Sequence, residues 1–316
     1  MAEIGKDIHR AKQLLTEGQL VAIPTETVYG LAANALNDKA VLEIFKAKSR
    51  PHFDPLIVHV ASLAQAETLS SSFPEKAKAL AQKFWPGPLT LLVPKKETVP
   101  DIVTSGLNTV GLRCPDHVLT LQLLQSLSFP LAAPSANPFG YVSPTTPQHV
   151  NEQLGDKVAY ILDGGECRVG IESTIVGFEN EQGMVLRLGG LAIENLEAFT
   201  GPLHVQLHSN SNPHAPGQLQ SHYAPGKKII LGTQAQLRAY THLHAGTIMF
   251  QHALPGVAPN QQIILSPGGD LEEAAQHLFA ALRTLDKTAI DVILAELVPE
   301  HGLGRAINDR LRRAAY

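Results

Sequence analysis

The sequence predicts an α/β protein in which a twisted, mixed sheet covered by helices is followed by a small, doubly wound domain of the Rossmann-like type. Short apolar runs with strand propensity alternate with amphipathic helical segments in the first part of the chain. Residues 201–228 interrupt this alternation, because they are rich in Pro, Gly, His, Ser and Asn. The alternation then resumes. We therefore divide the chain into a first domain at 1–205, a linker or lid at 206–227 and a second domain at 228–316.

The first domain is predicted to begin with a helix that ends at Gly18, since glycine favours the residue after a helix. The apolar stripe of that helix consists of Ile4, Ile8, Ala11, Leu14 and Leu15. Further helices are predicted at 38–49, 75–84, 116–127, 147–154 and 192–199. Strands are predicted at 19–23, 56–60, 89–93, 109–113, 130–133, 158–162, 173–178 and 184–188.

The second domain repeats the pattern on a smaller scale. Its strands are predicted at 228–231, 246–250, 261–265 and 291–296, and its helices at 233–241, 270–286 and 303–314. Two α/β domains also suit the length of 316 residues, which exceeds one typical domain.

Composition and charge exclude several classes of protein. With 44% hydrophobic and 17% charged residues and a formal net charge of -4, the chain lacks the broadly basic surface of a general nucleic-acid coat. Cys114 and Cys167 have no CxxC spacing, as expected in a reducing compartment. The first residues are too charged for a signal peptide, and no apolar run approaches the roughly 18 residues of a membrane span. We expect a cytoplasmic protein with no membrane partner.

A loop after the first predicted strand presents several hydroxyl groups. Pro24 ends the pairing of the strand at 19–23, and Thr25, Thr27 and Tyr29 follow it. Loops at strand ends commonly hold the ligands of α/β proteins. This loop is therefore our first candidate for a binding site.

A basic cluster follows at the end of the helix at 38–49. Lys46, Lys48 and Arg50 fall in or just after its last turn, and Pro51 stops it. One interpretation is a solvated helix end whose cations complement the macrodipole. The other interpretation is a functional role, on which replacing Lys48 or Arg50 by alanine should sharply reduce activity and leave the fold intact, because both side chains lie at a helix end rather than in the core.

Three predicted strands each carry one polar or cationic side chain, namely His59, Arg113 and Arg187. Such groups are seldom buried without a partner, and few acidic residues lie near them in sequence. They are therefore expected to converge on an anionic ligand, a phosphate or a carboxylate, which the arginine fork matches. The chain has neither GxxxxGK[ST] nor GxGxxG, so side chains would have to bind the phosphates of any nucleotide. It has no HExxH or Cys/His cluster, so we expect no dedicated metal site.

Several motifs in a fixed order resemble the YrdC-like family. They are PTETVYGL at 24–31, Lys48-Ser49-Arg50-Pro51, FWPGPLTLL at 84–92, VGLRCP at 110–115, APSAN at 133–137, IESTIV at 171–176 and LRLGG at 186–190. HYAP at 222–225 and GLGRAINDRLRRAA at 302–315 further resemble the two-domain form of this family, the threonylcarbamoyl-AMP synthases. The resemblance covers nearly the whole chain.

The resemblance implies an L-threonylcarbamoyladenylate synthase, a nucleotidyltransferase that converts L-threonine, bicarbonate and ATP into threonylcarbamoyl-AMP and pyrophosphate. The product serves the threonylcarbamoyl modification of a tRNA adenosine next to the anticodon, with handover to the transferase machinery. Mg²⁺ would be carried with ATP, on phosphates and waters. We expect no stable nucleic-acid binding.

The resemblance also implies roles for individual residues. Lys48, Arg50, Ser135 and Asn137 match the KxR and SxN set, which would form a catalytic cradle for phosphate and carbamate. The threonine site would contain Thr25, Tyr29, His59, Arg113 and Ser173, with Arg113 on the carboxylate. The nucleotide would contact that set together with Ser143, Arg187 and His222.

Two alternatives remain open at this point. His222 and Tyr223 could form a lid, but the preceding APGQLQS segment lacks the basic and aromatic residues common in the family, and a tether packed on the first domain is the other interpretation. The competing function is a non-catalytic double-stranded RNA or tRNA binding module that uses the basic residues as a groove.

Overall fold

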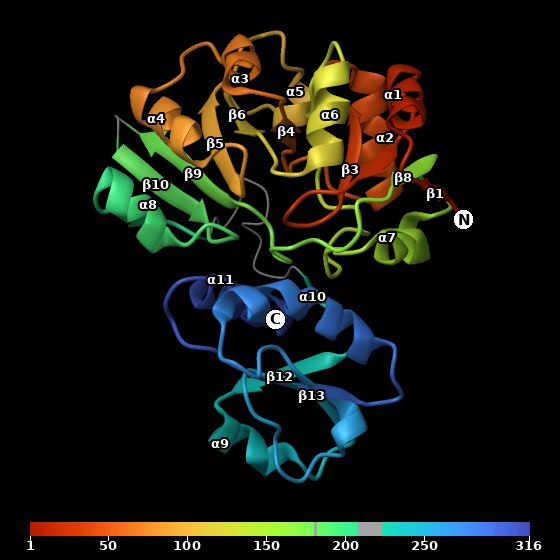
Figure 1. Cartoon of the computed structure of the whole chain (residues 1–316), viewed down its shortest axis with the longest axis vertical. Coiled ribbons are helices and arrows are strands. Elements are labelled where there is room, and N and C mark those ends of the chain that lie inside the picture. Colours follow the sequence, from red (N-terminus) through yellow and green to blue (C-terminus); the bar gives the residue numbers. More distant parts are fainter. Residues whose placement is uncertain (180–181, 208–222) are drawn as a thin grey trace.

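The structure is a computed structural model that describes residues 1–179, 182–207 and 223–316. Figure 1 shows a larger domain, coloured red to green, above a smaller domain in blue. Within the described ranges, the larger domain holds an 11-stranded mixed sheet and the smaller one a 4-stranded sheet whose strand pairs are all parallel. The predicted α/β fold class is confirmed.

The strands of the large sheet are given in their spatial order. They are β1 (Glu3–Gly5), β8 (Tyr160–Leu162), β2 (Val21–Ile23), β3 (Gly30–Asn34), β7 (Leu131–Ala132), β4 (Ile57–His59), β6 (Thr109–Arg113), β5 (Leu89–Pro94), β9 (Thr174–Glu179), β10 (Gln182–Arg187) and β11 (His204–Val205). β4 pairs parallel to β6, β6 antiparallel to β5, and β5 parallel to β9. This pairing brings three segments that are far apart in sequence to one end of the sheet.

Helices cover the large sheet. They are α1 (Ile8–Thr16), α2 (Asp38–Lys48), α3 (Leu63–Leu69), α4 (Glu75–Phe84), α5 (Asp101–Thr104), α6 (Val118–Ser126), α7 (Pro147–Leu154) and α8 (Ile193–Thr200). The assignment of Ile4 to the first helical stripe was wrong, because Ile4 pairs with Ile161 in β1 and the helix begins only after its N-cap, Asp7. The sequence patterns also missed β1, β3, β11, α3 and α5, which are short or, like β3 (GLAAN), rich in small residues.

The second domain follows its predicted pattern closely. Its sheet has the order β12 (Lys228–Gly232), β15 (Val292–Glu296), β13 (Ala245–Met249) and β14 (Gln262–Ile264). Its helices are α9 (Gln234–Leu237), α10 (Leu271–Asp286) and α11 (Gly304–Ala314). The helix expected at 233–241 consists of the short α9 and a 3₁₀ turn at Arg238–Tyr240. Within the described ranges 1–179, 182–207 and 223–316, no helix is long and apolar enough to cross a membrane.

The two domains share an apolar core. α10 and α11 lie on the side of the small domain that faces the large one (Figure 1). One cluster of buried side chains joins Val28, Val142 and Ile171 of the first domain to Phe279 of α10 and Ile307 of α11. Arg283 of α10 adds hydrogen bonds to the carbonyl oxygens of Val142 and Ser143. The second domain therefore forms part of the surroundings of the loop at 142–143.

Candidate active site

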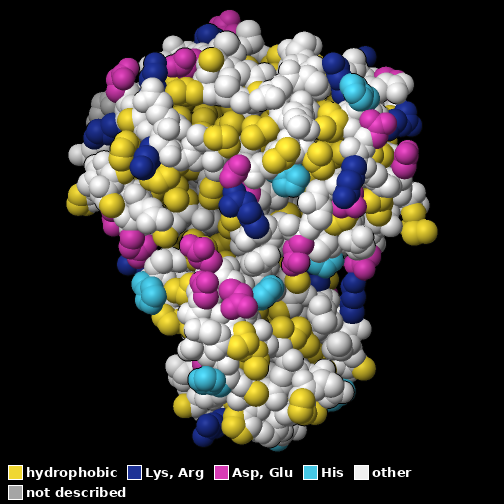
Figure 2. All heavy atoms as spheres, viewed as in Figure 1, with side chains coloured by type: hydrophobic (Ala, Val, Ile, Leu, Met, Phe, Trp, Pro, Cys, Tyr) yellow, Lys and Arg dark blue, Asp and Glu magenta, His cyan; other side chains and the backbone are white. Residues whose placement is uncertain are grey.

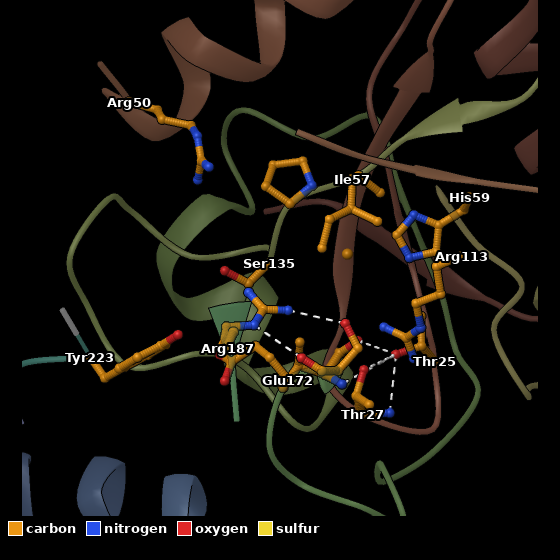
Figure 3. A pocket seen from close by; sticks show the side chains of 15 residues that line it. Thr25, Thr27, Arg50, Ile57, His59, Arg113, Ser135, Glu172, Arg187 and Tyr223 are labelled. Atoms are coloured by element: carbon orange, nitrogen blue, oxygen red, sulfur yellow. Dashed lines mark hydrogen bonds between the residues drawn. The ribbon is translucent and has the colours of Figure 1, made fainter. Parts of the chain in front are cut away.

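A pocket opens where strands of the large sheet end near the second domain. Figure 3 shows His59, Arg113 and Thr25 on one side of it and Arg50 and Tyr223 on the other. The lining residues are Thr25, Thr27, Val28, Gly30, Arg50, Ile57, His59, Arg113, Ala133, Pro134, Ser135, Glu172, Ser173, Arg187 and Tyr223. The structure thus brings together eight of the residues that the sequence singled out for the site: Thr25, Arg50, His59, Arg113, Ser135, Ser173, Arg187 and Tyr223.

The loop at residues 24–29 is held in one conformation by its own hydroxyls. The Oγ1 of Thr25 donates to the carbonyl of Val28 at 2.7 Å, accepts from the backbone N–H groups of Thr27 and Val28, and lies 2.8 Å from the Oγ1 of Thr27. Tyr29 is fully buried outside the pocket lining, and its hydroxyl donates to the carbonyl of Gly165 at 2.7 Å. Burial raises the pKa of this phenol, so it stays protonated. Thr25 and Thr27, rather than Tyr29, line the pocket.

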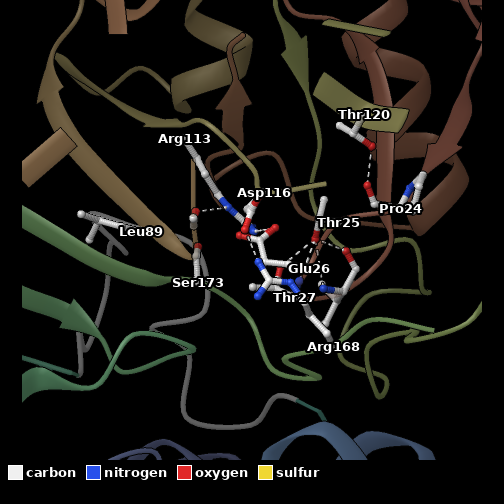
Figure 4. A network of polar contacts seen from close by, with 12 residues as sticks. Pro24, Thr25, Glu26, Thr27, Leu89, Arg113, Asp116, Thr120, Arg168 and Ser173 are labelled. Atoms are coloured by element: carbon white, nitrogen blue, oxygen red, sulfur yellow. Dashed lines mark hydrogen bonds and ion pairs between the residues drawn. The ribbon is translucent and has the colours of Figure 1, made fainter. Parts of the chain in front are cut away.

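Arg113 and a buried carboxylate face each other in the pocket wall. The Nη2 of Arg113 lies 2.7 Å from an Oε of Glu26, and both side chains are almost completely buried. Figure 4 shows this pair within a network that includes Thr25 and Thr27. The expectation that the strand cations lack acidic partners was wrong for Arg113, because Glu26 lies far from it in sequence and reaches it through the fold. Glu26 was visible in the PTETVYGL motif, but the spacing gave no signal of its partner.

His59 ends β4 inside the pocket. Burial, together with the nearby Arg113 guanidinium, lowers its pKa to about 3. The imidazole is therefore neutral at neutral pH. It can accept or donate a hydrogen bond, but it does not add a positive charge to the pocket.

The end of α2 places Arg50 in the pocket and Lys48 behind it. Ser49, with a φ of 53°, ends the helix in the left-handed conformation. Arg50 forms a buried ion pair with Asp54 at 2.9 Å and donates to the carbonyls of Asp54 and Pro55. The interpretation of the cluster as a solvated helix end was wrong for Lys48 and Arg50, which are 1% and 7% exposed.

Lys48 holds the loop that carries Ser135. Its Nζ donates to the carbonyl oxygens of Ser135 and Asn137. Burial, and next the neighbouring Arg50, lower the pKa of this amine well below its usual value. The amide of Asn137 donates to the carbonyls of Pro138 and Tyr141, at 2.8 Å each, so it also bonds to its own loop. Of the four KxR and SxN residues, Arg50 and Ser135 line the pocket, whereas Lys48 and Asn137 support them.

The start of β9 and the end of β10 form the third wall. Arg187 donates to the carbonyl and the hydroxyl of Ser173, at 3.0 Å each, and Ser173 lies 2.7 Å from the hydroxyl of Thr90. Gly189 permits this close packing, because a Cβ there would lie 2.2 Å from the carbonyl oxygen of Glu172. Burial lowers the pKa of Arg187 to about 10, so the guanidinium still carries its charge at neutral pH.

Ser143 does not line the pocket. Its hydroxyl donates to the carboxylate of Glu172 at 2.5 Å, and Glu172 does line it. Tyr223, which is 1% exposed, lines the pocket from the linker side, and its ring stacks on Phe279 of α10 at a centroid distance of 5.6 Å. His222 lies outside the described residues.

The geometry suits a small, multiply charged anion. Three guanidinium groups line the pocket, those of Arg50, Arg113 and Arg187, and neutral hydroxyls lie between them. Buried guanidinium groups can bind phosphate or carboxylate with paired hydrogen bonds. Within residues 1–179, 182–207 and 223–316, no group of three or more His, Cys, Asp or Glu side chains could hold a metal ion.

Comparisons with known families match both parts of the chain. Residues 13–189 match the family described as telomere recombination, which includes Sua5, YciO and YrdC. Residues 191–316 match the family described as threonylcarbamoyl-AMP synthase, C-terminal domain. The chain is 43% identical over 318 residues to the threonylcarbamoyl-AMP synthase of Pyrococcus abyssi, with 98% of this chain and 94% of that protein covered. It is 40% identical to that of Bacillus subtilis, with 98% and 92% covered.

Solved structures agree with these matches. The crystal structure of P. abyssi Sua5 complexed with L-threonine superposes with a TM-score of 0.93 at 40% identity, and the alignment covers 100% of this chain and 97% of that one. E. coli YciO, at 21% identity and a TM-score of 0.53, covers 60% of this chain and shows only the shared fold of the first domain.

Proposed function

We propose a mechanism from the premise that this chain belongs to the two-domain, Sua5-type threonylcarbamoyl-AMP synthase family. The protein is an ATP-using nucleotidyltransferase that supplies threonylcarbamoyl-AMP for the modification of tRNA. The observation that carries the mechanism is a pocket lined by three buried arginines together with Thr25 and Thr27.

The reaction needs no nucleophile from the protein. The amine of L-threonine attacks the carbon of bicarbonate, and loss of water leaves a carbamate. A carbamate oxygen then attacks the α-phosphorus of ATP, so that a new P–O bond forms while the bond to pyrophosphate breaks. Positioning of the two substrates and stabilisation of the negative charge at phosphorus must supply most of the rate enhancement.

The amino acid would occupy the side of the pocket that contains Thr25, His59 and Arg113 (Figure 3). Arg113 would bind the threonine carboxylate, while Thr25 and Ser173 offer hydroxyls and neutral His59 offers a ring nitrogen. Tyr29 was expected in this site. We assign it the role of fixing the loop at 164–165 beside the pocket, because its hydroxyl is bonded there.

The nucleotide would occupy the side that contains Arg50, Ser135 and Arg187. Lys48 and Asn137 would act through the loop they hold, and Ser143 through Glu172, because none of the three lines the pocket. Tyr223 already packs on the pocket, which supports a lid role for His222 and Tyr223.

Mg²⁺ would enter with ATP and be held by phosphate oxygens and water. The carboxylates nearest the nucleotide side, Asp54 and Glu172, are each paired with an arginine, so they fit poorly as metal ligands. We further propose that the reaction takes place in the cytoplasm and that the product passes to the tRNA threonylcarbamoyl transferase machinery.

The test is mass spectrometry of the products formed from ATP, Mg²⁺, bicarbonate and L-threonine. The expected products are threonylcarbamoyl-AMP and pyrophosphate, and omission of threonine or bicarbonate should abolish both. Formation of pyrophosphate without either of them would overturn the mechanism. A non-catalytic RNA-binding module would instead bind tRNA in a salt-dependent way and form no product. Figure 2 supports the enzyme, since basic side chains on the visible face are dispersed among acidic ones.

A further inference from the structure

An arginine of the second domain reaches the wall of the pocket. The Nε of Arg310, on α11, donates to the carboxylate of Glu172 at 2.9 Å, although the two residues are 138 positions apart in sequence. The Arg310 side chain is 0% exposed and that of Glu172 is 8% exposed. Glu172 lines the pocket directly before Ser173. The second domain therefore contacts the pocket through one buried ion pair.

Arg310 also contacts two further parts of the same wall. Its Nη2 donates to the carbonyl of Leu188 at 2.8 Å, directly after Arg187. Its guanidinium carbon lies 4.8 Å from the centroid of the Tyr223 ring, close enough for a cation–π interaction. One side chain thus connects the segments that carry Ser173, Arg187 and Tyr223.

The position of Glu172 depends on Arg310. One carboxylate oxygen accepts from Ser143 at 2.5 Å, and the other accepts from Arg310. A buried carboxylate that loses its cation becomes strongly unfavourable and turns towards water or another charge. The open pocket is beside it, where the nucleotide phosphates would meet that negative charge.

Asp309 keeps the guanidinium of Arg310 in place. Its carboxylate lies 2.6 Å from the Nη1 of Arg310 and accepts from the Nε of Arg313 at 3.0 Å. A rotamer held from both sides at full burial can fix the geometry of Glu172, which a flexible surface ion pair could not.

We propose that Arg310 is a positioning residue for the nucleotide side of the active site, and that the second domain thereby forms part of that site. The inference rests on the proposed function. Arg310 keeps the carboxylate of Glu172 away from the nucleotide phosphates. Its loss is therefore expected to weaken ATP binding more than threonine binding.

The experiment compares Arg310→Gln, Arg310→Lys, Glu172→Gln and the double variant Arg310→Gln/Glu172→Gln in the full chain. ATP affinity is measured by calorimetry without threonine, and KM for ATP and for threonine in the pyrophosphate assay. Arg310→Gln should raise the Kd and KM for ATP by about tenfold or more and the KM for threonine by less than about threefold. Arg310→Lys should recover part of the loss, because lysine keeps the charge without the fork geometry.

The double variant tests whether Arg310 acts through Glu172. Without Arg310, the Glu172 carboxylate is the source of repulsion, so replacing it by glutamine should restore ATP affinity to within about threefold of the wild type. If the changes in ATP affinity measured for Arg310→Gln and Glu172→Gln simply multiply in the double variant, Arg310 does not act through Glu172 and the proposal is wrong.

Two controls lie on the same helix. Asn308 is fully buried, and within the described part of the chain its side chain bonds to Val298 of its own domain, so Asn308→Ala should lower the Tm while leaving the Kd for ATP within about twofold. The Arg312 side chain is 54% exposed and pairs with Glu300 at the surface. Arg312→Gln should therefore change neither the Tm nor the Kd for ATP. If Arg310→Gln lowers only the Tm, as Asn308→Ala does, Arg310 is merely structural. Calorimetry with ATP alone keeps this test separate from product formation by the wild-type chain.

Discussion

His59 and Arg113 occupy paired positions on the adjacent parallel strands β4 and β6. Residues paired in this way place their side chains on the same face of the sheet, so the imidazole and the guanidinium share one wall of the pocket. The arginine adds to the effect of burial and lowers the pKa of His59 to about 3. Arg113 therefore remains the cation of this wall at neutral pH, and the adjacent imidazole is uncharged.

The pH dependence of stability should report this neutral histidine. In the unfolded chain the histidine has its ordinary pKa of 6.5, so between pH 6.5 and about 3 the unfolded state binds more protons than the folded state. The contribution of His59 to the free energy of unfolding should therefore be fully present above pH 6.5. It should fall as the pH drops below that value, by up to about 1.4 kcal/mol per pH unit. His59→Gln should flatten the loss of unfolding free energy between pH 7 and pH 5, measured by urea unfolding.

His149 contributes in the same direction, because burial, and next the nearby Arg283, lower its pKa to about 4. Some pH dependence should therefore persist in His59→Gln. If the variant and the wild type lose the same free energy over this range, His59 is not the group responsible.

Arg113→Ala should mainly raise the KM for threonine, with a smaller effect on kcat. A hydrogen bond between charged groups contributes about 1.5–3 kcal/mol, which corresponds to roughly 10- to 150-fold in KM. The same variant should be less stable, since it leaves Glu26 buried without its cation. Arg113→Met/Glu26→Gln should recover the stability but not the KM. A rise in the KM for ATP alone would move Arg113 to the nucleotide side.

Lys48→Met should reduce both synthesis and stability. It removes the donor to the carbonyls of Ser135 and Asn137, and each buried carbonyl left unsatisfied costs about 1–3 kcal/mol. The sequence analysis expected an intact fold after replacement of Lys48, because it placed this residue outside the core. Lys48 is 1% exposed, so we now expect a loss of stability as well. Lys46→Met is the matched control, because the Lys46 side chain is 60% exposed and pairs with Glu43 at the surface. Equal Tm values for the two variants would contradict a supporting role for Lys48.

Amino-acid specificity should depend on the small groups of the threonine side chain. Serine lacks only the methyl group, so its kcat/KM should fall by about 10- to 200-fold, corresponding to roughly 1–3 kcal/mol. Alanine lacks the hydroxyl as well and should be used less efficiently than serine. Pyrophosphate release with each amino acid at saturating ATP measures these ratios. If alanine reacts as well as threonine, the side chain is not recognised.

The sequence predicted most of the secondary structure because hydrophobic periodicity is a local property. α4 and α7 begin and end where the pattern placed them, and β4, β5 and β6 agree within about a residue. β3 was missed, since its GLAAN sequence has neither β-branched residues nor alternation. It is a strand because its neighbours β2 and β7 pair with it.

The pairing of charges in the site could not be predicted in the same way. Asp54 lies four residues after Arg50, so this ion pair could have been predicted from sequence spacing alone. Glu26 meets Arg113 and Glu172 meets Arg310 only after distant segments have come together. The motifs identified the cations, but the charge balance of the pocket is a property of the tertiary structure.

The long separation of Glu172 and Arg310 also sets an order of events during synthesis. A ribosome must add 138 residues after Glu172, of which Arg310 is the last. At about 5–20 residues per second this takes roughly 7–28 s. During that interval the first domain can emerge and begin to fold, but the carboxylate in its pocket wall has no cation from α11. A nascent first domain therefore differs electrostatically from the finished protein at the place where the ATP phosphates would lie.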